Sequence, residues 1–148
     1  METTQKTPKT GSLSRWVQRK MNARTTTRIR RKGGQYLGMD LLILHTVGRR
    51  SGQLRESPVT WFADGEGWLI VASGGGKVHP DWYVNLMANP GSASIEMHGG
   101  DALPVAPRRL EGDDRVRAWQ RVTDAQPRYA KYQRKSEREY PVVRLSLR

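Results

Sequence analysis

The sequence predicts an α+β protein, mainly β, in which an antiparallel barrel of about six strands is flanked by helices. The first supporting observation is that short apolar runs are joined by hairpin-type turns, such as Asp64-Gly65-Glu66-Gly67 and Gly99-Gly100-Asp101. The second is that one helical segment separates the third run from the fourth, and further helices come before the last run. This order lacks the regular strand–helix alternation of a parallel sheet and suits a small barrel.

Length and composition limit the classes of protein. A chain of 148 residues is long enough for one domain with a buried core. It has no cysteine, which excludes disulfides, a Cys-ligated zinc site and a thiol nucleophile. No apolar run approaches the roughly 20 residues of a membrane-spanning helix, and the N-terminus lacks the apolar core of a secretory signal. We therefore expect a cytoplasmic protein.

The net charge of +12 is concentrated near the N-terminus. Residues 1–38 hold ten Lys and Arg against one acid, whereas residues 39–148 hold sixteen against thirteen. The excess suggests nucleic acid, an anionic membrane or an acidic ligand as a partner. Nucleic acid is the least favoured, because the body of the chain is only mildly basic and carries no nucleic-acid motif.

The N-terminal part divides into residues 1–11, a tail that we expect to be disordered, and residues 12–38, a basic amphipathic helix with its linker. Residues 39–148 form the barrel domain. The linker is expected to begin at Thr25. We expect the apolar face of the helix to pack on the barrel. The alternative is that residues 12–32 make a peripheral contact with an anionic membrane, at the inner face of the plasma membrane. This apolar face consists of Leu13, Trp16, Val17 and Met21.

The stretch from Leu41 to Val59 carries the strongest functional pattern. Its first four residues are apolar and typical of a buried strand. Glycine then permits a loop geometry that points successive N–H groups the same way, and arginine offers a planar cation that fits phosphate or carboxylate. The pattern predicts an anion site, although a solvated hairpin turn gives the same pattern. The loop residues are Gly48, Arg49, Arg50, Ser51, Gly52 and Arg55.

A glycine-rich loop and a helix follow the third predicted strand, which runs from Trp68 to Ser73. The loop Gly74-Gly75-Gly76-Lys77 has neither Walker A nor dinucleotide spacing, and it is either flexible or a place where backbone closely approaches a ligand. The helix lies between His79 and Pro90, and most of its apolar face is core. Trp82, at its start, is a candidate wall for a ring-binding pocket.

The sequence of the second half of the chain predicts three more strands and two more helices. The strands are Ser92–His98, Ala102–Leu110 and Tyr140–Leu147. The first helix starts at Gly112, and a second helical segment follows Pro127 and places Tyr129 and Tyr132 on one face. The buried stripe of the first helix is expected to be Val116, Trp119 and Val122.

Several kinds of chemistry find no support. The three histidines, His45, His79 and His98, lie far apart with no carboxylate at ligand spacing, so we expect no metal site. No Gly-x-Ser-x-Gly elbow and no pair of carboxylates stands out. The arginine loop, the glycine loop and the nearby aromatic residues instead suit a large, aromatic, phosphorylated cofactor that carries the redox chemistry.

Three motifs together resemble the deazaflavin-dependent nitroreductase family of actinobacteria, within the split β-barrel reductases that use coenzyme F-420, a deazaflavin. The motifs are residues 48–55, 71–76 and 80–90, followed by the tyrosine pair and the closing Pro-Val-Val. The resemblance implies a split β-barrel that binds the reduced deazaflavin. It also implies hydride transfer to an electrophilic small molecule, which is a quinone, an activated alkene or a nitro compound.

The resemblance further implies roles for residues. The arginine loop holds the cofactor phosphate and its acidic oligoglutamyl tail, and the Ala-Ser-Gly-Gly segment and Trp82 lie against the ring. The late tyrosines cover the substrate side, where one positions the substrate or relays a proton. The implied catalytic residues are Tyr129, Tyr132 and Ser73. The implied cofactor contacts are Arg49, Arg50, Ser51, Gly52, Arg55, Ser57, Pro58, Ala72, Ser73, Gly74, Gly75, Lys77 and Trp82.

Three positions depart from the nitroreductase branch of this family. Gly74 stands where that branch has a lysine, and Thr60 and Gln126 stand where it has tyrosines. These positions affect substrate choice, so a quinone or an activated double bond is as good a candidate acceptor as a nitro compound. Two alternatives stay open. One is a related barrel that holds FMN in the same loop, and the other is a non-enzymatic binder of nucleic acid or anionic surfaces through the basic arm. Both a monomer and a homodimer are compatible with the sequence.

Overall fold

Six strands close into an antiparallel barrel in the computed structural model, which describes residues 12–74 and 78–148. Around the barrel the order is β2-β3-β4-β7-β6-β5, and β5 pairs with β2 to complete the ring. A short strand, β1, extends the sheet beside the start of β2. The strands are β1 (Gln35–Tyr36), β2 (Met39–Val47), β3 (Leu54–Asp64), β4 (Gly67–Val71), β5 (Ser94–Glu96), β6 (Leu103–Arg109) and β7 (Val142–Leu147).

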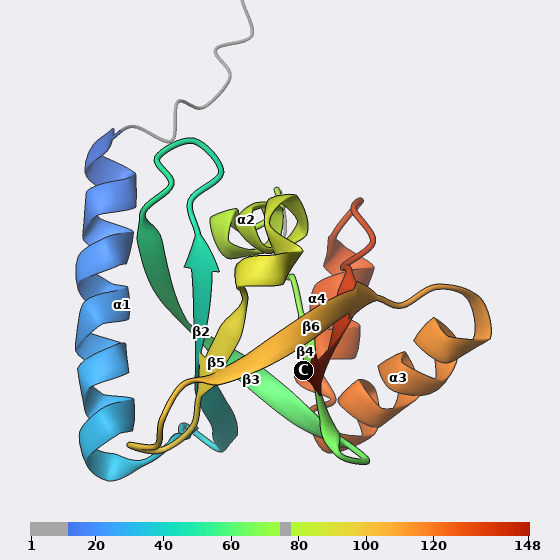
Figure 1. Cartoon of the computed structure of the whole chain (residues 1–148). Helices are drawn as coiled ribbons and strands as arrows, with labels where there is room; N and C mark the ends of the chain where they lie inside the picture. The colour runs from blue at the N-terminus through green and yellow to red at the C-terminus, as the bar shows by residue number, and fades with distance from the viewer. Residues whose placement is uncertain (1–11, 75–77) are drawn as a thin grey trace, which may run out of the picture.

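Helices cover two sides and one end of the barrel (Figure 1). The long helix α1 (Ser12–Lys32) stands beside β2 and β3, and α3 (Gly112–Ala125) and α4 (Arg128–Lys135) lie on the opposite side. Helix α2 (Asp81–Ala88) lies next to the loop that joins β2 to β3, and the 3-10 turn η1 (Pro90–Ser92) follows it. The predicted six-stranded antiparallel barrel with flanking helices is confirmed.

Strand β2 is buried on both faces, which explains why its sequence is an unbroken apolar run. Leu42 and Leu44 pack inside the barrel, whereas Leu41 and Ile43 pack outside it against Ile29 of α1. The same alternation separates the rest of the core into an interior cluster and a cluster beneath α3 and α4. The barrel interior is closed by Tyr83 and Leu86 of α2, so α2 is held firmly by the core.

The hairpin between β3 and β4 is the tight turn that the Asp-Gly sequence predicts. Asp64 pairs with Gly67, which leaves Gly65 and Glu66 as the two turn residues, and Gly65 has a φ of +59°. Gly67 is needed for another reason, because a Cβ there would come within 2.7 Å of Leu145 O in the neighbouring strand β7.

The structure corrects the prediction for the end of α1. The helix continues through the expected linker to Lys32 and ends at Gly33, which has a φ of +95° and donates its N–H to Ile29 O at 3.0 Å. Threonines at positions 25 and 27 stay helical because their hydroxyls bond to the carbonyls of Met21 and Ala23. The division into an N-terminal arm, residues 1–38, and a barrel domain, residues 39–148, stays a prediction.

The prediction for the contact face of α1 is also wrong. Val17 and Met21 are 44% and 62% exposed, whereas Thr26 and Ile29 are buried against the barrel. The contacting stripe therefore contains a threonine, and its apolar pattern is too weak to be recognised in the sequence. The side chains of Leu13 and Trp16 lie outside the described part of the chain.

The predicted stripe of α3 is wrong at one position. Val116 is 66% exposed, and the helix buries Ala118 and Val122, with Trp119 partly buried beside them. Arg115 occupies the place expected for an apolar residue, because its guanidinium lies over the Trp119 ring at 5.5 Å and donates to the carbonyl of Tyr140 at 2.8 Å.

Within the described residues, no helix combines the length and the apolar character required to cross a membrane.

The contact face of α1 generates a stability prediction. Ile29→Ala removes a fully buried side chain and should lower the free energy of unfolding by roughly 2–4 kcal/mol. Met21→Ala, on the same helix, should change it by less than about 0.5 kcal/mol, because Met21 is exposed. Urea unfolding followed by circular dichroism measures both. Equal losses in the two variants would contradict the observed packing of α1.

Candidate functional site: a cationic pocket beside the arginine loop

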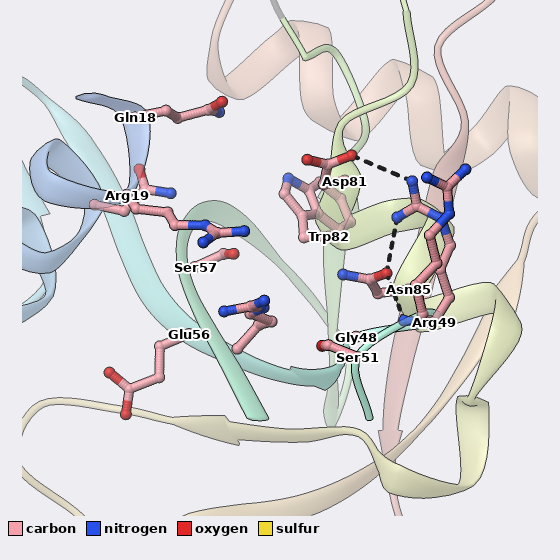
Figure 2. A pocket seen from close by; sticks show the side chains of 13 residues that line it. Gln18, Arg19, Gly48, Arg49, Ser51, Glu56, Ser57, Asp81, Trp82 and Asn85 are labelled. Carbon is pink, nitrogen blue, oxygen red and sulfur yellow. Dashed lines mark hydrogen bonds and ion pairs between the residues drawn. The ribbon is translucent and has the colours of Figure 1, made fainter. Parts of the chain in front are cut away.

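A cavity of about 190 Å3 lies between α1, α2 and the loop that joins β2 to β3 (Figure 2). The loop contributes arginines and a serine, and α1 and α2 contribute polar side chains from opposite sides. We call this cavity the cationic pocket. It is lined by Gln18, Arg19, Asn22, Gly48, Arg49, Arg50, Ser51, Arg55, Glu56, Ser57, Asp81, Trp82 and Asn85.

The loop itself is closed by short hydrogen bonds. Gly48 N–H donates to Gln53 O at 2.8 Å, Gly52 N–H donates to Gly48 O at 2.9 Å, and Gln53 N–H donates to Ser51 Oγ at 3.2 Å. A Cβ at Gly48 would collide with the Ser51 hydroxyl, and Gly52 has a φ of +67°. Both glycines are therefore required by the geometry that sets the loop between the two strands.

Arg49 is fixed to α2 rather than left free. The side-chain oxygen of Asn85 accepts hydrogen bonds from Arg49 N–H at 3.1 Å and from Arg49 Nη1 at 2.9 Å. Asp81 lies 3.5 Å from Arg49 Nη2. Because Asn85 is buried, this amide locks the loop to the helix, and the charge of Arg49 is already shared with a carboxylate.

The other three arginines of the pocket have no carboxylate within ion-pair distance among the described residues. They are Arg19, Arg50 and Arg55. The second acid of the pocket, Glu56, is paired with Arg30 of α1 at 2.7 Å. The pocket therefore has surplus positive charge, which suits an anionic ligand with more than one charged group.

The end of β4 lies next to the start of α2. Gly74 has a φ of +53°, and a Cβ there would come within 2.8 Å of Pro80, the residue that precedes α2. Arg138 holds this segment from the other side, since its Nη1 donates to Ala72 O at 3.1 Å and its Nη2 donates to Ser73 O at 2.7 Å. The left-handed backbone and the lack of space explain why glycine, not lysine, follows Ser73 here.

The tyrosine pair of α4 forms an aromatic group with Phe62. The rings of Tyr129 and Tyr132 lie edge to face at 5.8 Å, and Phe62 lies 5.6 Å from Tyr129. Burial raises the pKa of Tyr129, so its phenol stays protonated at neutral pH. Tyr132 is 47% exposed, and its carbonyl accepts a hydrogen bond from Tyr140 Oη at 3.2 Å.

The tyrosine pair connects to the end of β4 through Tyr140, which bonds the Tyr132 carbonyl, and through Arg138. The guanidinium of Arg138, which binds the Ser73 carbonyl, lies 5.1 Å from the centre of the Tyr140 ring. The arginine loop, the β4 end and the tyrosine helix are therefore linked through α2 and Arg138, although they come from distant parts of the sequence.

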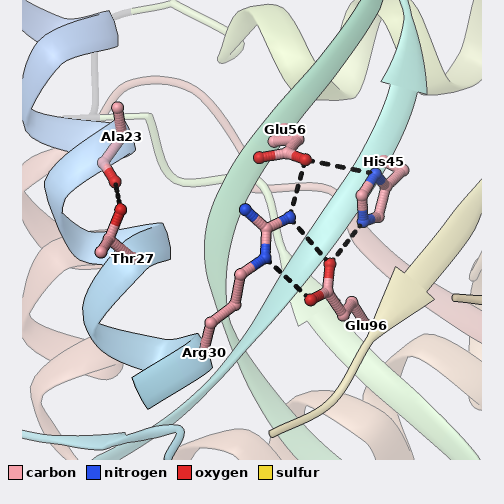
Figure 3. Close-up of polar contacts among 6 residues, drawn as sticks. All are labelled: Ala23, Thr27, Arg30, His45, Glu56 and Glu96. Carbon is pink, nitrogen blue, oxygen red and sulfur yellow. Dashed lines mark hydrogen bonds and ion pairs between the residues drawn. The ribbon is translucent and has the colours of Figure 1, made fainter. Parts of the chain in front are cut away.

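The expectation that no carboxylate accompanies a histidine is wrong for His45. Strand β2 pairs with both β3 and β5, which brings His45 beside Glu56 and within 3.1 Å of Glu96 (Figure 3). Arg30 fills the space between the two carboxylates, with contacts of 2.7 Å to Glu56 and 2.8 and 2.9 Å to Glu96. The cluster is therefore an ion-pair network in this structure.

A second cavity, of about 360 Å3, lies beside α3 and also contains arginines. Here Asp64 pairs with Arg121 and Arg144, and Asp114 pairs with Arg108 and Arg117. Each arginine of this larger cavity thus has a carboxylate partner, so its size gives no reason to expect a strong anion site.

The structure sorts the predicted cofactor contacts into four groups. The residues that line the cationic pocket are Arg49, Arg50, Ser51, Arg55, Ser57 and Trp82. Those in the adjoining loop and barrel wall are Gly52, Pro58 and Ala72. Those at the end of β4 are Ser73 and Gly74. Those outside the described residues are Gly75 and Lys77.

Sequence reasoning missed the part of the pocket that comes from helices, and also one acid, Glu56, on β3. It did not place α1 there, and it did not identify the two acids or the buried amide. The missed residues are Gln18, Arg19, Asn22, Glu56, Asp81 and Asn85. For the helix residues the available signals were helical spacings, between Arg19 and Asn22 and between Asp81 and Asn85, and Glu56 on β3 had none.

Comparisons with known proteins identify the family. The model of the family described as F420H(2)-dependent quinone reductase matches residues 15–146. The F420H(2)-dependent quinone reductase Rv1261c of Mycobacterium tuberculosis is 40% identical over 112 residues, which is 72% of this chain and 73% of that protein.

Solved structures point to the same family. An F420-H2 dependent reductase (FDR-A) superposes with a TM-score of 0.63 at 35% identity, over 72% of this chain and 93% of that one. A structure described as a domain-swapped dimer superposes with a TM-score of 0.65 at 30% identity, over 91% of this chain and 100% of that one. These similarities favour neither the FMN alternative nor a nucleic-acid binder. The chain belongs to the F420H(2)-dependent quinone reductase family, and it is an oxidoreductase whose cofactor is coenzyme F-420.

Proposed function

We propose that this protein binds reduced F-420 with its anionic end in the cationic pocket and its ring beside the end of β4, and that it reduces a quinone. The observation that supports the binding mode is the set of three arginines without carboxylate partners. The phosphate and carboxylates of F-420 supply the negative partners that these arginines lack, so the pocket fits the anionic end of the cofactor. The bound deazaflavin supplies the hydride.

The protein's own residues position the two reactants. Arg50 and Arg55 bind the phosphate, while the Asn85 contact keeps Arg49 and the loop in place. The ring lies beside the backbone of Ser73, whose carbonyl Arg138 holds in place, and the close packing of Gly74 on Pro80 keeps this segment next to α2. Trp82 lines the pocket side of this segment.

The aromatic group of α4 supports a quinone as the acceptor. Tyr132 is exposed beside the buried rings of Tyr129 and Phe62, so its ring is available to pack against a flat, apolar acceptor. Reduction of a quinone adds one hydride and one proton, and a protonated phenol is a suitable donor for the proton. Gln126 is engaged with Gly38 O at 2.8 Å, so it serves the fold at this position.

The first prediction concerns the cofactor phosphate. Titration with F-420, followed by Trp fluorescence, should show binding that Arg50→Ala/Arg55→Ala weakens by at least about tenfold, because charged hydrogen bonds are lost. FMN in parallel should bind more weakly than F-420.

The matched control is Arg108→Ala/Arg117→Ala, which removes two arginines from the second cavity. It should leave the dissociation constant unchanged. An equal loss in both double variants would mean that net charge, rather than the cationic pocket, attracts the cofactor.

The second prediction concerns the proton. Tyr132→Phe or Tyr129→Phe should lower kcat for quinone reduction on the order of 10²-fold, with a smaller change in KM, if that phenol is the donor. Because burial raises the pKa of Tyr129, the activity of an enzyme that uses this phenol should persist above about pH 10, the ordinary value for tyrosine. Unchanged kcat in both variants would mean that neither phenol donates the proton and that the tyrosines only line the site.

We infer that α1 also touches an anionic membrane, where quinones dissolve. Val17 and Met21 are exposed one turn apart on a helix rich in arginine. Val17→Asp/Met21→Asp should reduce co-sedimentation with anionic lipid vesicles several-fold without loss of fold. Vesicle binding that is the same in this variant and the unchanged protein would remove the inference.

A further inference from the structure

We propose that α1 forms the outer wall of the cofactor site and that Arg19 binds the carboxylates of an acidic chain attached beyond the cofactor phosphate. This inference rests on the proposed function and names the part of the ligand that α1 recognises. It assigns a specificity role to a residue outside the arginine loop and more than two dozen residues before it in the chain.

The first support is the position of α1. Gln18, Arg19 and Asn22 lie within one helical turn and all line the pocket. Figure 2 shows the Arg19 side chain extending from α1 into the pocket, toward Ser57 and the arginine loop. Two amides flank the guanidinium, so this wall offers hydrogen-bond donors to carboxylates.

The second support is the charge balance. A phosphodiester carries one negative charge, and two cations, Arg50 on the loop and Arg55 at the start of β3, already exceed it. Arg19 adds a third cation without a carboxylate partner, at the side of the pocket away from α2. A ligand that carries further carboxylates beyond its phosphate satisfies this cation, whereas a bare phosphate leaves it unpaired.

The third support is the way α1 is held. Arg30, eleven residues after Arg19, is bonded to Glu56 and Glu96 through three contacts of 2.7 to 2.9 Å (Figure 3). Glu56 is itself part of the pocket lining. Arg30 therefore does two things, since it fixes the helix to β3 and β5 and neutralises an acid that would repel an anionic ligand.

Helix geometry connects the two ends. At 1.5 Å per residue, Arg19 lies roughly 16 Å from Arg30 along the axis, and the intervening segment is unbroken helix. Ile29 secures the same end of the helix in the core. The anchored end thus determines where Arg19 stands over the pocket.

The experiment compares two forms of the cofactor and two arginines of one helix. The ligands are F-420 with several glutamates and the glutamate-free form that keeps the phosphate, both titrated into the full chain with Trp fluorescence as the readout. Arg19→Gln should weaken binding of the long form about three- to tenfold and leave the short form unchanged. Arg24→Gln is the matched control, because Arg24 is exposed on α1 but does not line the pocket, and it should change neither.

Arg30→Gln provides a second variant that does not touch the ligand. It should also weaken the long form selectively, because α1 loses its anchor and Glu56 its partner. Circular dichroism of each variant confirms that the helix content is kept.

The outcomes separate the two proposals. If the unchanged protein binds neither cofactor form, the proposed function fails and this inference fails with it. If it binds both forms but Arg19→Gln and Arg24→Gln behave alike, the role of α1 is wrong and the proposed function stands. Equal weakening of both forms by Arg19→Gln would move Arg19 to the phosphate and overturn its assignment to the acidic chain.

Discussion

The contact between Asn85 and Arg49 is the one on which the pocket depends. A buried amide oxygen receives both the backbone N–H and the side chain of the second residue of the arginine loop. Through it, a loop between two strands is fixed to a helix that the barrel core itself holds by Tyr83 and Leu86. Without this contact the loop would be a hairpin turn with Arg49 and Arg50 in solvent, and their charges would be largely screened.

Burial of β2 on both faces is the second constraint that positions the site. Its inner residues complete the barrel, and its outer residues receive α1 through Ile29. The strand therefore determines where the arginine loop emerges and where α1 stands. Pairing of β2 with β3 and β5 also places the two acids that receive Arg30, so packing and ion pairs position α1 together.

Much of the fold could be predicted from local patterns. The Asp-Gly hairpin, the apolar run of β2 and the proline before α2 each act over a few residues. The arginine loop could be predicted as an anion site for the same reason, since its glycines and cations are adjacent in sequence.

The errors arose where tertiary contacts override local pattern. The face of α1 that meets the barrel includes Thr26, and Arg115 of α3 replaces an apolar residue by covering Trp119. The share of the pocket that comes from α1 could not be read from the sequence, because packing of α1 on the outside of β2 brings Arg19 next to a loop about thirty residues away. The neighbours of His45 were missed for a related reason, since the strand register and not sequence spacing places Glu56 and Glu96 beside it.

The central claim is that the cationic pocket, and not the larger arginine-containing cavity beside α3, receives the anionic end of the cofactor. The most direct test is a two-dimensional NMR spectrum of the arginine Nε–H groups recorded while F-420 is added. The account predicts that the signals of Arg50 and Arg55 shift in proportion to occupancy, while those of Arg117 and Arg121 stay in place. Shifts confined to Arg117 and Arg121 would contradict it and move the cofactor to the other side of the barrel.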